Sequence, residues 1–147
     1  MKKYLLGAII IAGLSLQSCS KDDESYSQSE LLCRKDWKIE KVYIEEGGVE
    51  LDVFDVYFED CEGDDVFSYT LEGRFERDDH TSTCESTSSL TKGDWLFPEG
   101  DESRLWLVND FDYEKYSIEK LAKDISILSV DMYYGNVIKK VNLKFTH

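Results

Sequence analysis

The stretch DISILSVDMYYGNVIKKVNLKF, residues 124–145, decides the fold class of this chain. It contains two runs rich in Ile, Val, Leu and Tyr, which favour β-strands over helices. Gly135-Asn136 joins the two runs, and a two-residue connection with glycine first is typical of a β-hairpin. The sequence therefore predicts two antiparallel strands, 124–133 and 137–145.

A second hairpin is predicted earlier in the chain. In the run Trp37–Ile44 apolar residues alternate with charged ones, but the apolar phase shifts near Glu40 and Lys41. Such a shift indicates either a β-bulge, in which one strand carries an extra residue, or strong coiling of the strand at this point. Gly47-Gly48 follows, and both glycines can take positive φ angles at no steric cost, so we expect a tight turn there.

Further strands follow at intervals of about 8 to 12 residues, a spacing typical of an antiparallel sandwich or barrel. No helix of normal length interrupts them, and Leu31–Cys33 predicts only a short helical turn at the start. The sequence thus predicts an all-β domain of about eight to ten short strands. The remaining predicted strands are 49–58, 66–71, 74–77, 93–97, 104–108 and 115–121.

The N-terminus has the layout of a secretory signal. Lys2 and Lys3 give a positive start, residues 4–16 form an uncharged apolar run, and small residues follow. The run is too short for a spanning helix, which needs about 20 apolar residues. We expect residues 1–18 to be the signal peptide, residues 19–29 to form a tether and residues 30–147 to form one domain.

Leu16-Gln17-Ser18-Cys19 resembles a bacterial lipobox, in which the signal is cut before a cysteine that becomes lipidated. The resemblance implies that Cys19 anchors the protein in membrane lipid, and several acyl chains suffice for stable attachment. An ordinary signal peptide with a coincidental cysteine is the alternative. Lys21 and the three acids after it resemble the surface-export tag of Bacteroidota lipoproteins, which implies an outer-membrane protein exposed at the cell surface.

The formal net charge of −14 excludes one class of partner. Nucleic-acid binding requires a basic surface that displaces phosphate counterions, so we expect no nucleic-acid partner. The same charge leaves the lipid as the membrane attachment. No phosphate-binding glycine loop follows a strand and no zinc-ligand spacing occurs, so no cofactor is predicted.

Several motifs occur in a set order along the predicted strands: Trp37, Cys61-x-x-Asp64-Asp65 before Phe67, Gly73, Cys84, Gly93-x-Trp95 and Ile118-x-x-Leu121. Their order resembles the lipocalin-like domains of Bacteroidota lipoproteins and covers nearly the whole domain. The resemblance implies an antiparallel up-and-down lipocalin-like barrel, with a closed end near Trp37 and an open mouth.

Three cysteines remain after Cys19. The family pattern carries both Cys61 and Cys84, which lie in polar, turn-rich segments, so we predict a disulfide between them in an exported protein. Such a bridge contributes about 3 kcal/mol in the chain-entropy model. Cys33 is interpreted as a small buried hydrophobic residue, with pairing to another chain as the alternative.

Aromatic side chains are the candidate ligand contacts. Trp37, Trp95, Trp106 and Tyr69 lie on predicted strands and could line a cavity inside the barrel. The same aromatics could instead form a plain hydrophobic core. An eight-stranded barrel is just wide enough either to be filled by its own side chains or to hold one small ligand, so size does not decide between the two.

The segment Asp60–Asp65 is rich in carboxylates, which calcium prefers as ligands. Gly63 stands fourth in it, whereas a calcium loop requires glycine at the sixth position, so a solvated acidic turn is favoured. The two histidines, His80 and His147, do not sit in a recognisable nucleophile setting. We therefore predict no metal site and no catalytic residue.

The sequence as a whole predicts a non-catalytic binding protein. Its barrel would hold a small apolar or glycan-type ligand, or a protein partner, at the open end. Recognition would come from the loops 60–65, 78–90 and 98–103, because loops on a rigid scaffold carry function. The alternative is a solid-cored structural or interaction subunit of an envelope complex.

Overall fold

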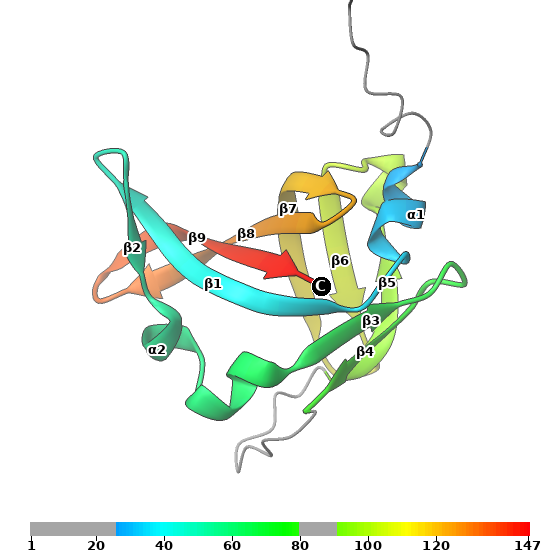
Figure 1. Cartoon of the computed structure of the whole chain (residues 1–147), viewed down its shortest axis with the longest axis horizontal. Helices are drawn as coiled ribbons and strands as arrows, with labels where there is room; N and C mark the ends of the chain where they lie inside the picture. Colours follow the sequence, from blue (N-terminus) through cyan, green and yellow to red (C-terminus); the bar gives the residue numbers. More distant parts are fainter. Residues whose placement is uncertain (1–25, 80–90) are drawn as a thin grey trace, which may run out of the picture.

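The computed structural model describes residues 26–79 and 91–147. In them, eight antiparallel strands close into an up-and-down barrel, and one extra strand, β2, extends the sheet beside β1 (Figure 1). The strands are β1 (Trp37–Glu46), β2 (Val49–Asp52), β3 (Val66–Tyr69), β4 (Arg74–Asp78), β5 (Lys92–Leu96), β6 (Arg104–Val108), β7 (Tyr113–Ala122), β8 (Ile125–Tyr134) and β9 (Val137–Thr146). The short helices are α1 (Gln28–Leu32), α2 (Phe54–Tyr57), and the 3₁₀ turns η1 (Asp60–Asp64) and η2 (Pro98–Gly100).

The first and last strands close the barrel. Each strand from β3 to β8 pairs with the next one along the chain, and β9 pairs with β1, so that Lys38 lies opposite Thr146. The other edge of β1 pairs with β3 at its start and with β2 at its end. The β1–β9 register shifts between Ile39 and Lys41, which confirms that the strand is irregular where the sequence predicted it.

Both predicted hairpins are confirmed. Gly47 and Gly48 connect β1 to β2 with φ angles of 60° and 82°, values that L side chains rarely adopt. Gly135 has a φ of 62° and stands first in the turn between β8 and β9. The glycines thus allow the tight turns of the β1–β2 and β8–β9 hairpins without strain.

The prediction of a strand through residue 58 is wrong. β2 ends at Asp52, and the chain then forms α2. The Asp52 carboxylate accepts a 3.0 Å hydrogen bond from the backbone N–H of Phe54, a local bond that competes with continuing a strand. Phe54 and Phe58, four residues apart, stack with ring centroids 5.4 Å apart. A short apolar run cannot be assigned to strand or helix by pattern alone.

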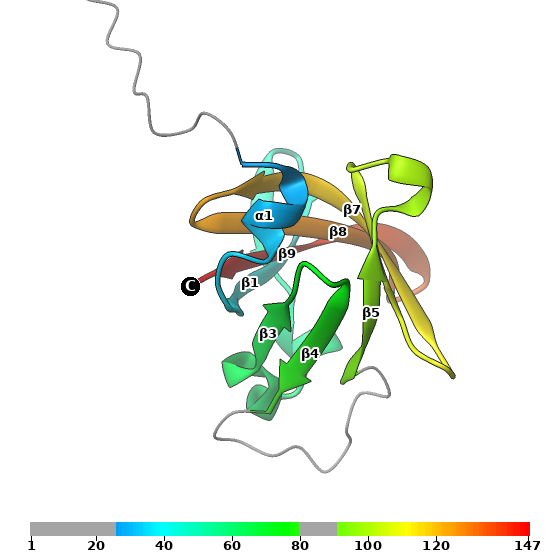
Figure 2. The same cartoon turned by 90° about the vertical axis from the view of Figure 1, so that its right-hand side faces the viewer.

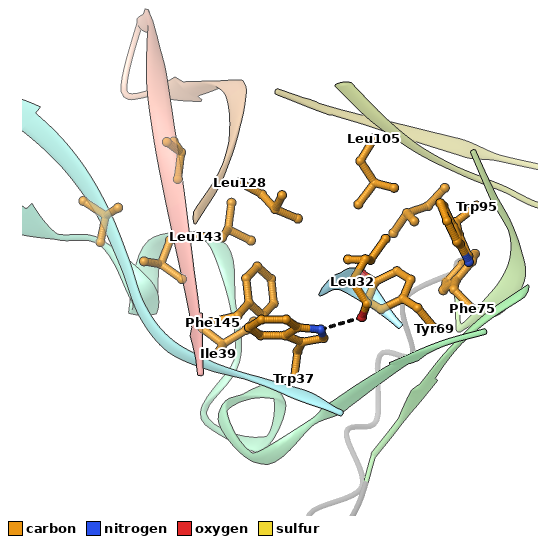
Figure 3. Close-up of a cluster of buried hydrophobic side chains, with 14 of the residues drawn as sticks. Leu32, Trp37, Ile39, Tyr69, Phe75, Trp95, Leu105, Leu128, Leu143 and Phe145 are labelled. Carbon is orange, nitrogen blue, oxygen red and sulfur yellow. Dashed lines mark hydrogen bonds between the residues drawn. The ribbon is translucent and has the colours of Figure 1, made fainter. Parts of the chain in front are cut away.

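One end of the barrel is closed by α1, as Figure 2 shows. A capping box between Ser27 and Glu30 begins this helix, and Leu32 at its end is 2% exposed. The indole Nε1 of Trp37 donates a 2.8 Å hydrogen bond to the Leu32 carbonyl (Figure 3). The His147 ring lies against Trp37, with ring centroids 4.0 Å apart. No helix in the described residues is long and apolar enough to cross a membrane.

The barrel wall follows strand alternation, with inward side chains in the core. On β6, Leu105 and Leu107 are 0% and 3% exposed. Gly93 on β5 is required for close packing, because a Cβ there would lie 2.1 Å from the Val108 carbonyl oxygen. This contact gives the Gly93-x-Trp95 motif a physical reason: the wall is too tight for a side chain at Gly93.

Candidate ligand cavity

A cavity of about 590 Å³ lies inside the barrel. This volume falls within the range of about 300 to 1,000 Å³ that is typical of small-molecule sites. Much of its wall is aromatic or aliphatic, since the inward positions of six strands supply it. The main apolar contacts are Phe67, Phe75, Leu107, Leu128, Met132 and Phe145.

The cavity lies towards the end of the barrel opposite α1. It is lined by Arg77 near the end of β4, Glu114 near the start of β7 and Met132 near the end of β8. In an up-and-down barrel these strand ends meet at one rim. Tyr113, 61% exposed, also lines the cavity and marks its solvent side.

A buried ion-pair cluster forms one side of the cavity. Arg77 lies opposite Phe67 in the β3–β4 ladder, and its guanidinium donates from Nε to Asp65 and from Nη2 to Glu62. The three side chains are only 9%, 2% and 14% exposed, in the order Arg77, Asp65 and Glu62. Burial raises the pKa of Asp65, and the bonds from Arg77 oppose that shift. η1 thus turns two acids inward to neutralise one arginine.

This cluster also accounts for the acidic segment that suggested calcium. Glu62 and Asp65 each accept a hydrogen bond from Arg77 on one carboxylate oxygen, and the other oxygen of Glu62 accepts from the backbone N–H of Glu59. Within residues 26–79 and 91–147, no group of three or more His, Cys, Asp or Glu side chains could hold a metal ion.

A second polar group lines the cavity from β7, three strands away from β4 in the sheet order. Glu114 on β7 lies opposite the inward-facing Leu107 of β6, and the Tyr116 hydroxyl donates a 2.6 Å hydrogen bond to its Oε2. Burial raises the pKa of Glu114, while the bond from Tyr116 and the charge of Arg77 act in the other direction. The result is a half-buried carboxylic acid facing an apolar space.

Of the four predicted ligand contacts, Tyr69 lines the cavity. Trp37 and Trp95 are 1% and 7% exposed and belong to the hydrophobic core (Figure 3). Trp95 stacks edge-on against Tyr69 and donates from Nε1 to the Thr70 carbonyl. Trp106 alternates with inward-facing leucines on β6, so it lies on the outer wall, where the Lys115 ammonium sits 4.6 Å from its ring centroid.

The three predicted recognition loops also differ in where they lie relative to the cavity. Segment 60–65 contributes Glu62 to the cavity. Segment 98–103 contains η2 and connects β5 to β6 at the α1 end, away from the cavity (Figure 2). Most of segment 78–90, including His80, lies outside the described residues.

The predicted roles of the cysteines remain predictions. Cys33 caps the C-terminus of α1 with a free thiol, and burial raises its pKa to about 11, a value at which the reactive thiolate is scarce at neutral pH. Cys61 lies in η1, but its predicted partner Cys84 falls outside the described residues. Cys19, the signal peptide and most of the tether also lie outside them.

Sequence reasoning missed Arg77 and Glu114, two charged residues on strands that line the cavity. A signal was present in the spacing. Arg77 follows the inward-facing Phe75 by two positions, and Glu114 precedes Tyr116 and Ile118 by two and four. Residues spaced by two share one face of a strand, so charges in phase with apolar residues indicate polar groups inside the barrel.

Comparison with known proteins adds no assignment. No protein-family model matches the chain, and no curated protein matches its sequence. Fold and site therefore define only a class: a small closed antiparallel β-barrel with a largely apolar internal cavity, whose lining also carries the charged side chains of Glu62, Arg77 and Glu114.

Proposed function

We propose that this chain is a lipoprotein, anchored in the outer membrane through Cys19, whose barrel binds a small amphipathic ligand without catalysing a reaction. The observation that carries the proposal is the cavity of about 590 Å³ inside the barrel. A barrel of eight strands can be filled by its own side chains, and this one leaves room for a molecule.

The lining supports a ligand with one apolar part and one polar part. Such sites are mostly hydrophobic, with a few polar groups that fix orientation. Here Phe67, Phe75 and Leu128 provide the apolar wall, while Arg77 and Glu114 provide the polar groups. The cavity also weighs against the alternative of a solid-cored structural subunit.

The first test is native mass spectrometry of a chain starting at Glu24, exported and purified without detergent. Residues 26–147 contain the closed barrel with its core, so this chain keeps the folded unit. We expect extra mass of a few hundred daltons, the size of a ligand that fills such a pocket, that is lost on denaturation. If the chain carries no extra mass, binding is measured with an added ligand, the dye Nile red.

A cavity-filling variant supplies the decisive test. Met132 is half-buried and lines the cavity, whereas its neighbour Tyr133 on β8 is 70% exposed and points outward. Met132→Trp should abolish binding of the neutral apolar dye Nile red, and the matched control Tyr133→Trp should leave it unchanged. If the chain binds no dye and retains no ligand, or if both variants bind equally, the cavity is not the binding site.

A protein partner is a second candidate, favoured by an exposed apolar surface. Val49, Tyr133, Val137 and Ile138 are each more than half exposed. They lie on the β1–β2 and β8–β9 hairpins, which project together from the barrel in Figure 1 and are joined by the ion pair of Lys139 with Glu46. Tyr133 and Ile138 lie directly opposite each other in the β8–β9 ladder and share one face, whereas Val137 points to the other face. Exposed apolar patches such as the Tyr133–Ile138 pair mark interaction sites. Ile138→Ser should then reduce capture of an envelope protein without affecting dye binding.

A further inference from the structure

The charges around the cavity indicate which polar end a ligand should carry. The charged residues of the lining are Glu62, Glu114, Asp131, Arg77 and Lys115. Asp131 and Lys115 occupy exposed, outward positions of β8 and β7, so the inward charges are those of Glu62, Glu114 and Arg77. Asp65, bonded to Arg77, adds a further acid beside them. Acids therefore outnumber bases at the site, and the whole chain carries a net charge of −14. A field of one sign raises the local concentration of oppositely charged ligands.

The two basic residues are poorly placed to bind an anionic ligand. Arg77 already donates to both Asp65 and Glu62, which neutralise its charge. The Lys115 ammonium lies over the rings of Trp106 and Tyr113, 4.6 Å from each centroid, on the outer side of the wall. A ligand carboxylate entering the cavity would face acids without a basic partner of its own, at a considerable desolvation cost.

Glu114, in contrast, can accept hydrogen bonds from a ligand. An ionised carboxylate offers about four acceptor sites, and the Tyr116 hydroxyl uses one of them, on Oε2. That bond also fixes the side chain against the wall, so that little conformational entropy is lost when a ligand binds. Burial disfavours the ionised form of Glu114, and a cationic ligand would compensate for this cost.

Building on the proposed function, we propose that the cavity selects amphipathic molecules whose polar end is a protonated amine, with Glu114 as the group that binds it. A neutral hydroxyl would bind less tightly, because it can donate a hydrogen bond to the carboxylate but brings no positive charge to compensate for the burial of that carboxylate. A carboxylate of the same chain length would bind least tightly.

The test compares decylamine, decanol and decanoic acid as competitors for Nile red on the chain starting at Glu24. We expect affinity to fall in that order, with the amine favoured over the acid by roughly tenfold to a hundredfold, the worth of one charge-assisted hydrogen bond. Glu114→Gln should remove most of the preference for the amine and leave decanol binding nearly unchanged.

Glu76→Gln is the matched control. Glu76 lies on β4 between Phe75 and Arg77, exposed and on the outer face, so the variant makes the same change in charge outside the cavity. The inference is overturned if decanol binds but decanoic acid competes as well as decylamine, or if Glu76→Gln weakens amine binding as much as Glu114→Gln does. If none of the three compounds displaces the dye and the dye itself does not bind, the proposed function fails instead.

Discussion

The two ends of the barrel are built from the same strands but are packed in different ways. At the closed end, Leu32, Trp37 and Leu105 are at most 2% exposed. The indole N–H of Trp37 donates a hydrogen bond to the backbone carbonyl of Leu32. At the open end, the same strands enclose a cavity, Arg77 and Asp65 are buried as a charged pair, and Glu114 faces an apolar space. The closed end is tightly packed, which favours stability. The open end is packed less tightly and has charged groups beside a cavity.

The largest effect should come from removing the buried arginine. Arg77→Met leaves Asp65 and Glu62 without their partner, and breaking a buried ion pair from one side costs about 3 to 5 kcal/mol. Urea denaturation measures the loss. Arg74→Met on the same strand is the control, because the Arg74–Asp94 pair is 62% exposed on both sides and should contribute below about 1 kcal/mol. Equal losses would contradict the assignment of Arg77 as the structural centre of the open end.

A pair of leucines on β6 compares the two ends directly. Leu105→Ala should cost about 3 to 5 kcal/mol, because a fully enclosed site leaves an empty cavity. Leu107→Ala should cost less, about 2 kcal/mol, since one side of Leu107 already borders the existing cavity and fewer contacts are lost. Both values follow from urea midpoints at constant m-value. A larger loss for Leu107 would mean that the open end is packed as tightly as the closed one.

His147→Ala should weaken the closed end by about 1 kcal/mol. The ring packs against Trp37 at a tilt of 42°, and its nitrogens lie 2.6 Å and 3.1 Å from the carbonyl oxygens of Asp36 and Lys123. The variant removes the ring contact and both of these polar contacts. Thermal unfolding monitored by near-UV circular dichroism, which reports on the Trp37 environment, measures the change. Unchanged stability would show that α1 alone closes this end.

The smallest effect, and one of opposite sign, is expected for Glu114→Gln. Burial raises the pKa of Glu114 in the folded chain above its unfolded value of about 4.3. The folded state therefore gains stability from the protonated form, fully below about pH 4.3, and loses it as pH rises through the raised pKa. Gln mimics the protonated form at every pH. The variant should match the parent at acidic pH and become more stable towards neutral pH.

The control for this pH profile is internal. The pKa of Asp65 is also raised by burial, but Asp65 is present in both chains and cancels in the difference. A series of urea midpoints between about pH 4 and pH 7 gives the profile. A variant less stable than the parent at neutral pH would mean that the Glu114 carboxylate stabilises the fold rather than a ligand.

The sequence predicted the all-β barrel because its turns are marked by glycine. Gly47-Gly48 and Gly135-Asn136 located two hairpins, and the strand Arg104–Val108 was predicted with its observed bounds. Residues 53–58 were mistaken for strand, since the local bond from Phe54 to Asp52 leaves no periodic signal. Alternation in the sequence does not tell which face of a strand points into the barrel when both faces carry aromatic residues. Trp106 was therefore expected inside the barrel, and Glu114 was overlooked.

The cavity itself could not be predicted from the residues. Its volume depends on how far side chains from six strands reach across the barrel, and that distance is fixed by long-range pairing. The ion pairs of Arg77 likewise depend on η1 folding back on β4, which brings together residues 12 and 15 positions apart in a geometry that composition does not encode.

The closure of β1 on β9 also sets an order on how the chain can fold. These strands join Lys38 to Thr146, across nearly the whole domain. Hairpins between neighbouring strands can form as soon as both strands have been synthesised. The barrel can close only when the last residues of the chain are available. Until then the free edges of β1 and β9 remain open to pairing with other chains, a state prone to aggregation. Such non-local pairing is also intrinsically slow, so we expect C-terminal truncation before β9 to yield aggregates rather than a smaller barrel.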